Sequence, residues 1–520
     1  MDSAVDAKAD LKAVVVADLP DEPFQPLTLS RPHCLLRLCN VPMIEYTLEF
    51  LATAGVVETI IMCQAHSEVL LDYIRGSRWS RSTSQMKVVV RGLSADSTLG
   101  DALRAVDFSS TVKANFILCT GVAVSNMDLT QLVAAHTVRA RDGNHIMTML
   151  LQEATPAHPR WDKCDESVYF IDPATNKLLA LCSQAALPRA KSVAIQRKII
   201  TDNAEVELRA DLMDTNIAIC TPDVLALFTE NFDYHSMRQD FVSGIIESED
   251  LHSKTIYAHV LSGASNLPTE SAASGTASGA HAHGSLHCIS QSGYAAGVTD
   301  TAAYDAISRD IVGRWAFPLC PDNSPTGDSV YKYSRGAVYK APSARLDRES
   351  RVERHVILGP DSQVANHAYI ADSVLGERCL VGEQTTIRAS YLFDDTKVGR
   401  NAVVDGSILG ERVTILDNVV IERGCLIGDD VTIGPNVRIP SFTRVASVPP
   451  RRSDEQFSDM SDESDSDSDA SSEAADGLHA GRGGQAGAGP GTLASGFDSL
   501  SLVDKQVLGA SGVGYVWATL

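Results

Sequence analysis

A repeat of apolar-glycine pairs between Val356 and Pro440 restricts the fold more than any other feature of the sequence. The intervals between successive glycines of these pairs are 17, 6, 17, 11, 18 and 6 residues, each a multiple of six or one residue short of one. This period is typical of a left-handed parallel β-helix, in which each short strand places one apolar side chain inside a triangular coil. We therefore predict a β-helix over residues 352–445. The glycines are Gly359, Gly376, Gly382, Gly399, Gly410, Gly428 and Gly434.

Two roles are open for such a β-helix. Solenoids of this kind stack through exposed coils, so oligomerisation is the simpler expectation. An acyltransferase of this fold would need a catalytic histidine, for which His355 and His367 are the candidates.

Residues 11–151, the first part of a predicted domain at 11–320, follow a different pattern, in which strands alternate with helices. A helix stripe beginning at Leu99 follows a Ser97/Thr98 cap, and Gly55 ends an earlier helix. Regular alternation predicts an α/β domain with a doubly wound, Rossmann-type parallel sheet and a site at the carboxyl ends of its strands. The predicted strands are Ala13–Ala17, Glu58–Cys63, Met86–Val90, Asn115–Cys119 and His145–Leu151.

The loop after the first predicted strand lacks the residues that bind phosphate. It runs from Asp18 to Thr28 and contains three prolines, three carboxylates and no glycine. A phosphate-binding loop needs glycines for close backbone approach and free N–H groups, which proline does not supply. This loop should repel a triphosphate.

The surrounding residues resemble the opening of sugar-nucleotide pyrophosphorylases. Pro26-Leu27-Thr28 and Arg31-Pro32 match the Pro-Leu-Thr and Lys-Pro of that family, whereas its preceding Gly-rich loop is missing. The family also carries a Gly-Asp after the strand equivalent to Asn115–Cys119, and the Asp holds the catalytic metal. Here Gly121 is followed by Val122, so the resemblance implies a kept scaffold without its catalytic residues and without a metal.

Such a pseudo-pyrophosphorylase followed by a β-helix resembles the catalytically inactive subunits of eukaryotic translation initiation factor 2B, the guanine-nucleotide exchange factor for initiation factor 2. The epsilon kind, rather than its gamma paralogue, is favoured by an acidic tract and by the ending Gly512–Trp517. In that subunit an Asn-Phe pair contributes to exchange, which implies a partner contact at Asn231 and Phe232. From the residues alone, the same pair also fits a helix-capping asparagine beside a core phenylalanine.

Composition adds limits on partners. The net charge of −22 argues against nucleic acid, and no apolar run approaches membrane-spanning length. Eleven cysteines without a Cys-x-x-Cys pair, and no leader before Leu11, fit a cytosolic protein with reduced thiols.

Asp454–Asp476 holds ten carboxylates, and within it Ser464 and Ser466 each precede an Asp by three residues, which suits phosphorylation by an acidophilic kinase.

The sequence therefore divides into six parts. We expect a flexible N-terminus at 1–10, a nucleotidyltransferase-like domain at 11–320 with a disordered insertion at 262–300, and a linker at 321–351. The β-helix at 352–445 precedes a disordered acidic and Gly-rich linker at 446–511. Residues 512–520 are expected to start a further C-terminal segment, because they resemble the stretch just ahead of the helical exchange domain of the family. His281 and His283 in the insertion are read as solvated residues.

The resemblance implies an exchange-factor subunit with no catalytic residue, cofactor or metal. Its expected partners are the other subunits of initiation factor 2B, the gamma paralogue most directly, and initiation factor 2. The alternatives are a divergent sugar-nucleotide pyrophosphorylase and an inactive subunit that senses a sugar nucleotide.

Overall fold

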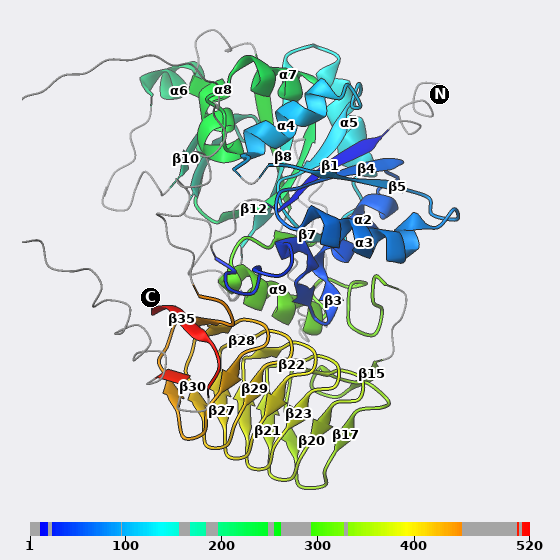
Figure 1. Cartoon of the computed structure of the whole chain (residues 1–520). Coiled ribbons are helices and arrows are strands. Elements are labelled where there is room, and N and C mark those ends of the chain that lie inside the picture. The colour runs from blue at the N-terminus through cyan, green and yellow to red at the C-terminus, as the bar shows by residue number, and fades with distance from the viewer. Residues whose placement is uncertain are drawn as a thin grey trace, which may run out of the picture.

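The structure is a computed structural model that describes residues 11–18, 23–94, 96–154, 167–183, 196–247, 254–261, 293–326, 331–449, 507–508 and 512–519. These residues form an α/β domain and a β-helix that lies beneath it (Figure 1). The predicted order of the two folds is confirmed.

A seven-stranded sheet forms the centre of the α/β domain, with the order β13-β8-β12-β6-β1-β4-β5. Four of the five predicted strands agree with it closely, and Met86–Val90 is shifted by one or two residues. The prediction of an entirely parallel sheet is wrong, because β12 runs antiparallel to both β6 and β8. The strands are β1 (Lys12–Asp18), β4 (Glu58–Cys63), β5 (Lys87–Gly92), β6 (Phe116–Cys119), β8 (His145–Glu153), β12 (Leu212–Cys220) and β13 (Thr255–Leu261).

Helices cover both faces of this sheet, as the doubly wound prediction requires. Along β1, Ala13 and Val15 belong to one hydrophobic cluster and Val14 and Val16 to another. A strand buried on both faces reads as a continuous apolar run, which is why this strand could be found from sequence. The helices are α2 (Met43–Thr53), α3 (Ser67–Gly76), α4 (Leu99–Phe108), α5 (Thr130–Ala140), α6 (Arg197–Asp202), α7 (Asp223–Glu230), α8 (Ser243–Glu247) and α9 (Thr301–Val312), with shorter turns at η1 (His33–Leu35), η2 (Arg78–Ser80) and η5 (Met237–Val242).

The helix ends test the predicted caps. The Thr98 hydroxyl accepts a hydrogen bond from the Asp101 amide, and the Asp101 carboxylate accepts one from the Thr98 amide, so the capping box of α4 is confirmed. Gly55 follows α2 with a φ of 81°, which a side chain would disfavour. Thr221-Pro222-Asp223 before α7 also has the residue order of a helix cap, but the Thr221 side chain makes no capping hydrogen bond.

Smaller sheets complete the domain, and one of them corrects a predicted boundary. β14 (Ala295–Gly297) is buried and pairs with β7 (Ala123–Ser125), so the end of the segment 262–300 is ordered. Residues 262–292, including His281 and His283, lie outside the described residues. The remaining strands of this domain are β2 (Arg37–Leu38), β3 (Val41–Pro42), β9 (Ser167–Ile171), β10 (Leu178–Ser183) and β11 (Glu207–Arg209).

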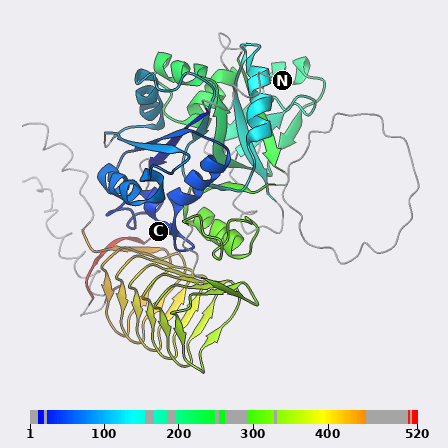
Figure 2. The same cartoon turned by 90° about the vertical axis from the view of Figure 1, so that its right-hand side faces the viewer.

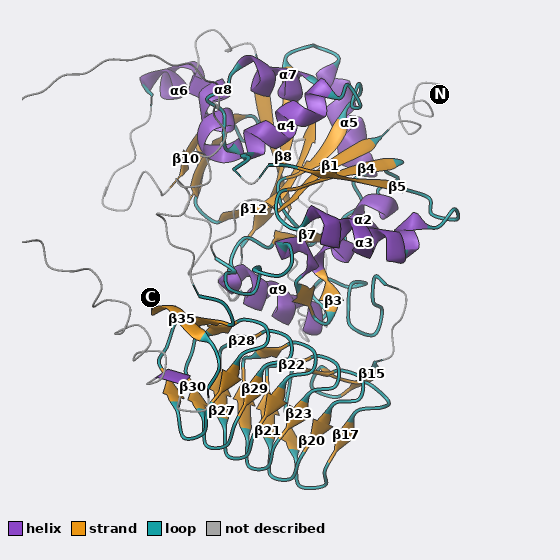
Figure 3. Cartoon of the chain, viewed as in Figure 1, coloured by secondary structure: helices purple, strands orange, loops and turns teal. Residues whose placement is uncertain are grey.

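The second domain has three faces, and each face is made of short parallel strands stacked on one another, as the orange arrows of Figure 3 show. At the corners a residue with positive φ recurs every five or six positions, for example Asp361, His367 and Asp372. The predicted left-handed β-helix is confirmed.

The β-helix begins earlier than predicted. Strand β16 (Val338–Lys340) already pairs in parallel with β19 (Val356–Leu358), so the proposed linker 321–351 contains most of the first coil. The further strands are β17 (Arg345–Leu346), β18 (Arg351–Val352), β20 (Gln363–Val364), β21 (Tyr369–Ala371), β22 (Val374–Leu375), β23 (Leu380–Val381), β24 (Thr386–Arg388), β25 (Tyr391–Leu392), β26 (Lys397–Val398), β27 (Val403–Asp405), β28 (Ile408–Leu409), β29 (Thr414–Ile415), β30 (Val420–Ile421), β31 (Leu426–Ile427), β32 (Thr432–Ile433), β33 (Arg438–Ile439) and β34 (Thr443–Ala446).

Antiparallel strands close both ends of one β-helix face. β15 (Lys332–Ser334) pairs with β16 at the first coil, and β35 (Tyr515–Thr519) pairs with β34 at the last. Residues 512–519 therefore pack against the β-helix domain, and the expectation that they start a further C-terminal segment stays a prediction.

The face formed by β16, β19, β22, β25, β28 and β31 packs under the α/β domain (Figure 2). Its outward side chains, among them Ile357, Tyr391 and Leu426, belong to the same hydrophobic cluster as α2 and α9. The two domains therefore share one apolar core.

Candidate functional site

The carboxyl end of the central sheet is where a doubly wound fold places its ligand. After β6 the chain passes through Gly121 to Val122, which is fully buried and accepts a hydrogen bond from the Val298 amide. A Cβ added at Gly121 would lie 3.2 Å from Nδ2 of Asn216, and one added at Gly297 would lie 2.5 Å from the same atom. The Asn216 side chain thus fills this corner of the sheet.

The turn after β6 offers no carboxylate ligand at the expected position, because Gly121 is followed by Val122. Where the resemblance to pyrophosphorylases leads one to expect a carboxylate, the apolar Val122 points into the core. The described residues contain no group of three or more His, Cys, Asp or Glu side chains placed to hold a metal ion. Asp21 and Glu22 of the loop after β1 lie outside the described residues.

The continuation of that loop binds the β-helix. The Arg31 guanidinium forms ion pairs with Glu411 and, at 2.8 Å, with Asp429, and the Ser30 hydroxyl donates to Asp429 as well. Pro26 packs close to Gly428. The residue at the position of the family's lysine is therefore engaged in the contact between the domains.

Electrostatics stabilise this contact. Burial alone would lower the pKa of Arg31, but hydrogen bonding to Glu411 and the charge of Asp429 raise it above the usual range. Burial would raise the pKa of Glu411, and the hydrogen bond and charge of Arg31 outweigh it and lower that pKa. Both groups are charged at neutral pH. A second ion pair, 2.7 Å between Arg37 and Asp394, links the domains nearby.

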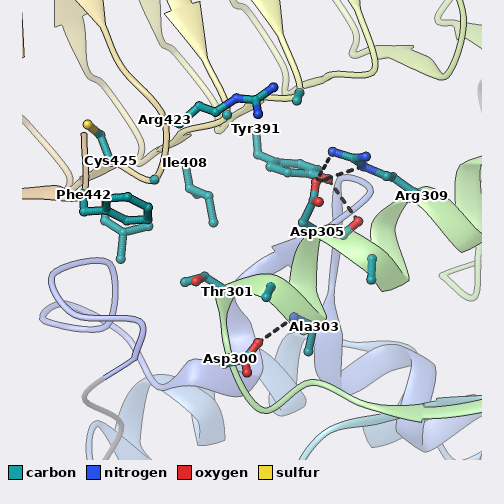
Figure 4. Close-up of a pocket in the computed structure, with 16 residues that line it drawn as sticks. Asp300, Thr301, Ala303, Asp305, Arg309, Tyr391, Ile408, Arg423, Cys425 and Phe442 are labelled. Atoms are coloured by element: carbon teal, nitrogen blue, oxygen red, sulfur yellow. Dashed lines mark hydrogen bonds and ion pairs between the residues drawn. The ribbon is translucent and has the colours of Figure 1, made fainter. Parts of the chain in front are cut away.

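A groove of about 430 Å³ lies between α9 and the β-helix (Figure 4). Its polar groups bind one another: the Tyr391 hydroxyl donates to Asp305 at 2.6 Å, and Arg309 pairs with the same carboxylate at 3.0 Å. Arg423 pairs with Asp405 at 3.0 Å, and Asp300 caps α9. We interpret this groove as part of the contact between the domains, because its charged side chains are already engaged.

Asn231 and Phe232 follow α7, which packs on the face of the sheet opposite to the one that faces α9. The Asn231 amide donates to the Leu227 carbonyl and its side-chain oxygen accepts from the Asp233 amide, so Asn231 ends the helix as the capping interpretation predicted. Phe232 does not enter the core. Its side chain is 70% exposed, and the Arg104 guanidinium lies 5.2 Å from the centre of its ring.

The neighbouring aromatic residues explain why Phe232 remains outside. Phe228 and Phe241 stack with ring centres 4.6 Å apart, and Tyr234 meets both rings edge-on. These three side chains fill the space beneath α7 and are buried. Phe232 thus lies in the chain between members of a firmly packed aromatic cluster, and its own side chain stays largely exposed.

The same surface contains a residue that the sequence analysis missed. Phe108, the last residue of α4, is 94% exposed and follows Arg104 by one helical turn. We call the exposed Phe232 and Phe108, together with the partly buried Asn231 and Arg104, the α4–α7 surface. Its exposure could have been predicted from the sequence, because Phe108 falls outside the apolar stripe of its helix.

The remaining candidates do not form a site. His355 pairs with Asp372 at 3.0 Å and His367 with Glu349 at 2.9 Å, each at a corner of the β-helix. Ser464 and Ser466 lie outside the described residues. Within the described ranges, no helix is both long and apolar enough to cross a bilayer.

Comparison with known proteins defines the class in agreement with the fold: a nucleotidyltransferase-like domain joined to a β-helix. Residues 22–158 match the family described as nucleotidyl transferase, and residues 335–439 match the family described as the EIF2B subunit epsilon LbH domain. A mannose-1-phosphate guanyltransferase of Candida glabrata is 40% identical over 52 residues, which cover 10% of this chain and 14% of that protein.

Two relatives match most of this chain. The translation initiation factor eIF2B subunit epsilon of Schizosaccharomyces pombe is 35% identical over 443 residues, 84% of this chain and 60% of that protein. Its namesake in Dictyostelium discoideum is 34% identical over 350 residues, 67% of this chain and 45% of that protein. The chain is similar to these eIF2B epsilon subunits over most of its own length, and it spans about half the length of the relatives it matches.

Proposed function

We propose that this chain is a subunit of an exchange factor that promotes GDP/GTP exchange on translation initiation factor 2, and that the α4–α7 surface contacts a partner protein during exchange. The observation that supports this role most strongly is the exposure of Phe232, whose neighbours in the chain form a packed aromatic cluster. Large rigid aromatic side chains and arginine are enriched at energetically important positions of protein interfaces.

Exchange requires no bond-making residue. It requires a surface that binds the G protein better without nucleotide than with it, since the two binding events oppose each other by linkage. The proposed partners are the other subunits of initiation factor 2B, the gamma paralogue most directly, and initiation factor 2. The proposed location is the cytosol, without direct contact to nucleic acid or membrane.

The test is GDP release from initiation factor 2, catalysed by the assembled complex that contains this chain. Replacing Asn231 and Phe232 with Ala should slow release at least about tenfold if Phe232 behaves as an interface hot spot. Phe317→Ala is the matched control, because Phe317 is also largely exposed, at 60%, but lies outside the α4–α7 surface. Unchanged release by the double variant, or equal slowing by the control, would refute the docking role.

We further propose that the nucleotidyltransferase-like domain makes no sugar nucleotide and holds no cofactor or metal. Support comes from the buried Val122 and from Arg31, which is engaged with the β-helix. Formation of a nucleotide sugar from a sugar 1-phosphate, a nucleoside triphosphate and Mg²⁺ by the purified chain would overturn this proposal. Stabilisation by a nucleotide sugar without turnover would favour the sensor alternative, because a ligand that binds only the folded state raises its stability.

Phosphorylation of Ser464 and Ser466 remains a proposal that depends on the sequence alone. Phosphate mapping of the protein from its own cells tests it, and unmodified serines at both positions would remove it.

A further inference from the structure

The last coil of the β-helix is covered by a segment that is remote in sequence. The final strand of the coil, β34, ends at Ala446, and the segment that covers this coil comprises residues 507–508 and 512–519. We call this segment the C-terminal clip. Without it, the last coil would present unpaired backbone groups, which readily accept a strand from another chain.

Backbone hydrogen bonds attach the clip to two of the three faces. On one face β35 runs antiparallel to β34, with Ala446 opposite Tyr515. On a second face Val513 and Thr432 exchange hydrogen bonds of 2.7 and 3.0 Å. The Gly434 amide donates to the Leu508 carbonyl at 2.7 Å. The clip therefore satisfies edge groups of the last coil on both faces.

Side chains make the contact specific to this segment. Leu508 is 2% exposed and belongs to the hydrophobic core of the β-helix, so it closes the apolar interior of the last coil. Trp517 donates its indole N–H to the Val448 carbonyl at 2.8 Å.

Close packing requires two glycines in the clip, Gly512 where the clip folds against its own Leu508 and Gly514 where it approaches β34. A Cβ at Gly512 would lie 2.2 Å from the Leu508 carbonyl oxygen, and one at Gly514 would lie 3.1 Å from the Ala446 carbonyl oxygen. A leucine anchor, two closely placed glycines and a short strand together describe the ligand that this edge accepts.

The two ends of the β-helix are closed in different ways. At the first coil the capping strand β15 is part of a local hairpin with β16. At the last coil the capping strand arrives only after the long stretch between Ala446 and Val507. A hairpin cap cannot separate far from its coil, whereas a cap on a long connection can leave its site and return.

We propose that the end of the β-helix is a strand-binding site whose ligand is the C-terminal clip, bound reversibly within the same chain. The covalent connection makes binding of the clip an intramolecular event with a high effective concentration, so the site is occupied without a partner. Release of the clip opens the last coil to an extended peptide of the same chemistry.

A labelled peptide of residues 507–519 tests the site in the full-length chain. Leu508→Asp places a charge in the apolar interior and should release the clip, because an unpaired buried charge is strongly disfavoured. Val513→Asp is the matched control, since it makes a similar change in the same segment at a side chain that is 59% exposed. Gly512→Val is a second releasing variant that leaves the β-helix interior unchanged.

The peptide should bind the Leu508→Asp and Gly512→Val chains at least about 100-fold more tightly than the wild-type and Val513→Asp chains, whose sites are occupied. Hydrogen exchange of the Thr432 and Gly434 amides should become faster in the two releasing variants only. Equal peptide binding by all four chains, binding by none of them, or unchanged exchange of these amides would overturn the proposal.

Discussion

The ion pairs of Arg31 connect the two domains, and Arg31→Ala should destabilise the protein far more than the loss of an exposed pair does. The side chains of Arg31, Glu411 and Asp429 are only 17, 16 and 10% exposed. Removing one partner therefore leaves two carboxylates with little access to water. Breaking a buried pair in this way costs about 3–5 kcal/mol, and the remaining exposure reduces the expected loss here to about 2–3 kcal/mol.

The matched control is Arg378→Ala. Arg378 makes a bidentate pair with Asp395 at a β-helix corner, but the two side chains are 51 and 39% exposed. Exposed pairs contribute about 0–1 kcal/mol, so this variant should lose no more than that.

The assay is urea unfolding of both variants, followed by circular dichroism at low and high salt. Salt should change the effect of Arg31→Ala little, because buried charges are weakly screened. A double-mutant cycle between Arg31 and Glu411 should give a coupling free energy of at least about 1 kcal/mol. Equal losses for Arg31→Ala and Arg378→Ala, or no coupling in the cycle, would refute the view that this contact stabilises the domain pair.

Three further predictions concern the α/β domain. Burial lowers the pKa of His136 to about 3, so below pH 6.5 only the unfolded state gains a proton on this side chain. The free energy of unfolding therefore falls as the pH falls from 7.5. In urea unfolding, His136→Gln should lose about 1.4 kcal/mol less of this free energy than the wild type between pH 7.5 and 5.5. Gly100→Ala should lower the melting temperature because its Cβ would lie 2.0 Å from the Tyr234 carbonyl oxygen, whereas Gly76→Ala, with open space around it, should leave it unchanged or slightly raised. Phe228→Ala should cost about 3–5 kcal/mol, and the exposed Phe232→Ala at most about 0.5 kcal/mol; similar losses would contradict the burial difference.

The parts of the fold that sequence predicted well are those with a local pattern. The first strand reads as an apolar run because Ala13 and Val14 face different clusters. The β-helix was found because glycines recur where coils touch: a Cβ at Gly359 would lie 2.1 Å from the Gly376 carbonyl oxygen. A steric requirement that repeats with every coil leaves a periodic trace in the sequence.

The parts that escaped prediction depend on partners distant in the chain. The direction of β12 is set by pairing with β6 and β8, and a single strand does not encode it. The first coil lacks the apolar-glycine pairs, since Lys340 is followed by Ala341. The clip could not be read as a cap because its partner strand ends at Ala446, far upstream.

At the candidate site, the sequence predicted the helix cap at Asn231 but did not decide whether Phe232 is buried or exposed. Asn231 caps its helix as expected from the residue type. Whether a phenylalanine is buried depends on the space left by its neighbours, and that space is taken by Phe228, Tyr234 and Phe241. Phe108 was missed because helical periodicity identifies the residues that face the core, not those that face a partner.

The stacking of the coils also fixes the distance between the two ends of the β-helix. Seven strands from β16 to β34 follow one another along the face beneath the α/β domain, at about 4.8 Å per step, so the two ends of this face lie roughly 29 Å apart. The coils share one apolar interior, and this separation can change only in whole coils. Inserting or deleting one coil would move the end that bears the clip by about 4.8 Å relative to the α4–α7 surface, and intermediate spacings are not accessible to this architecture.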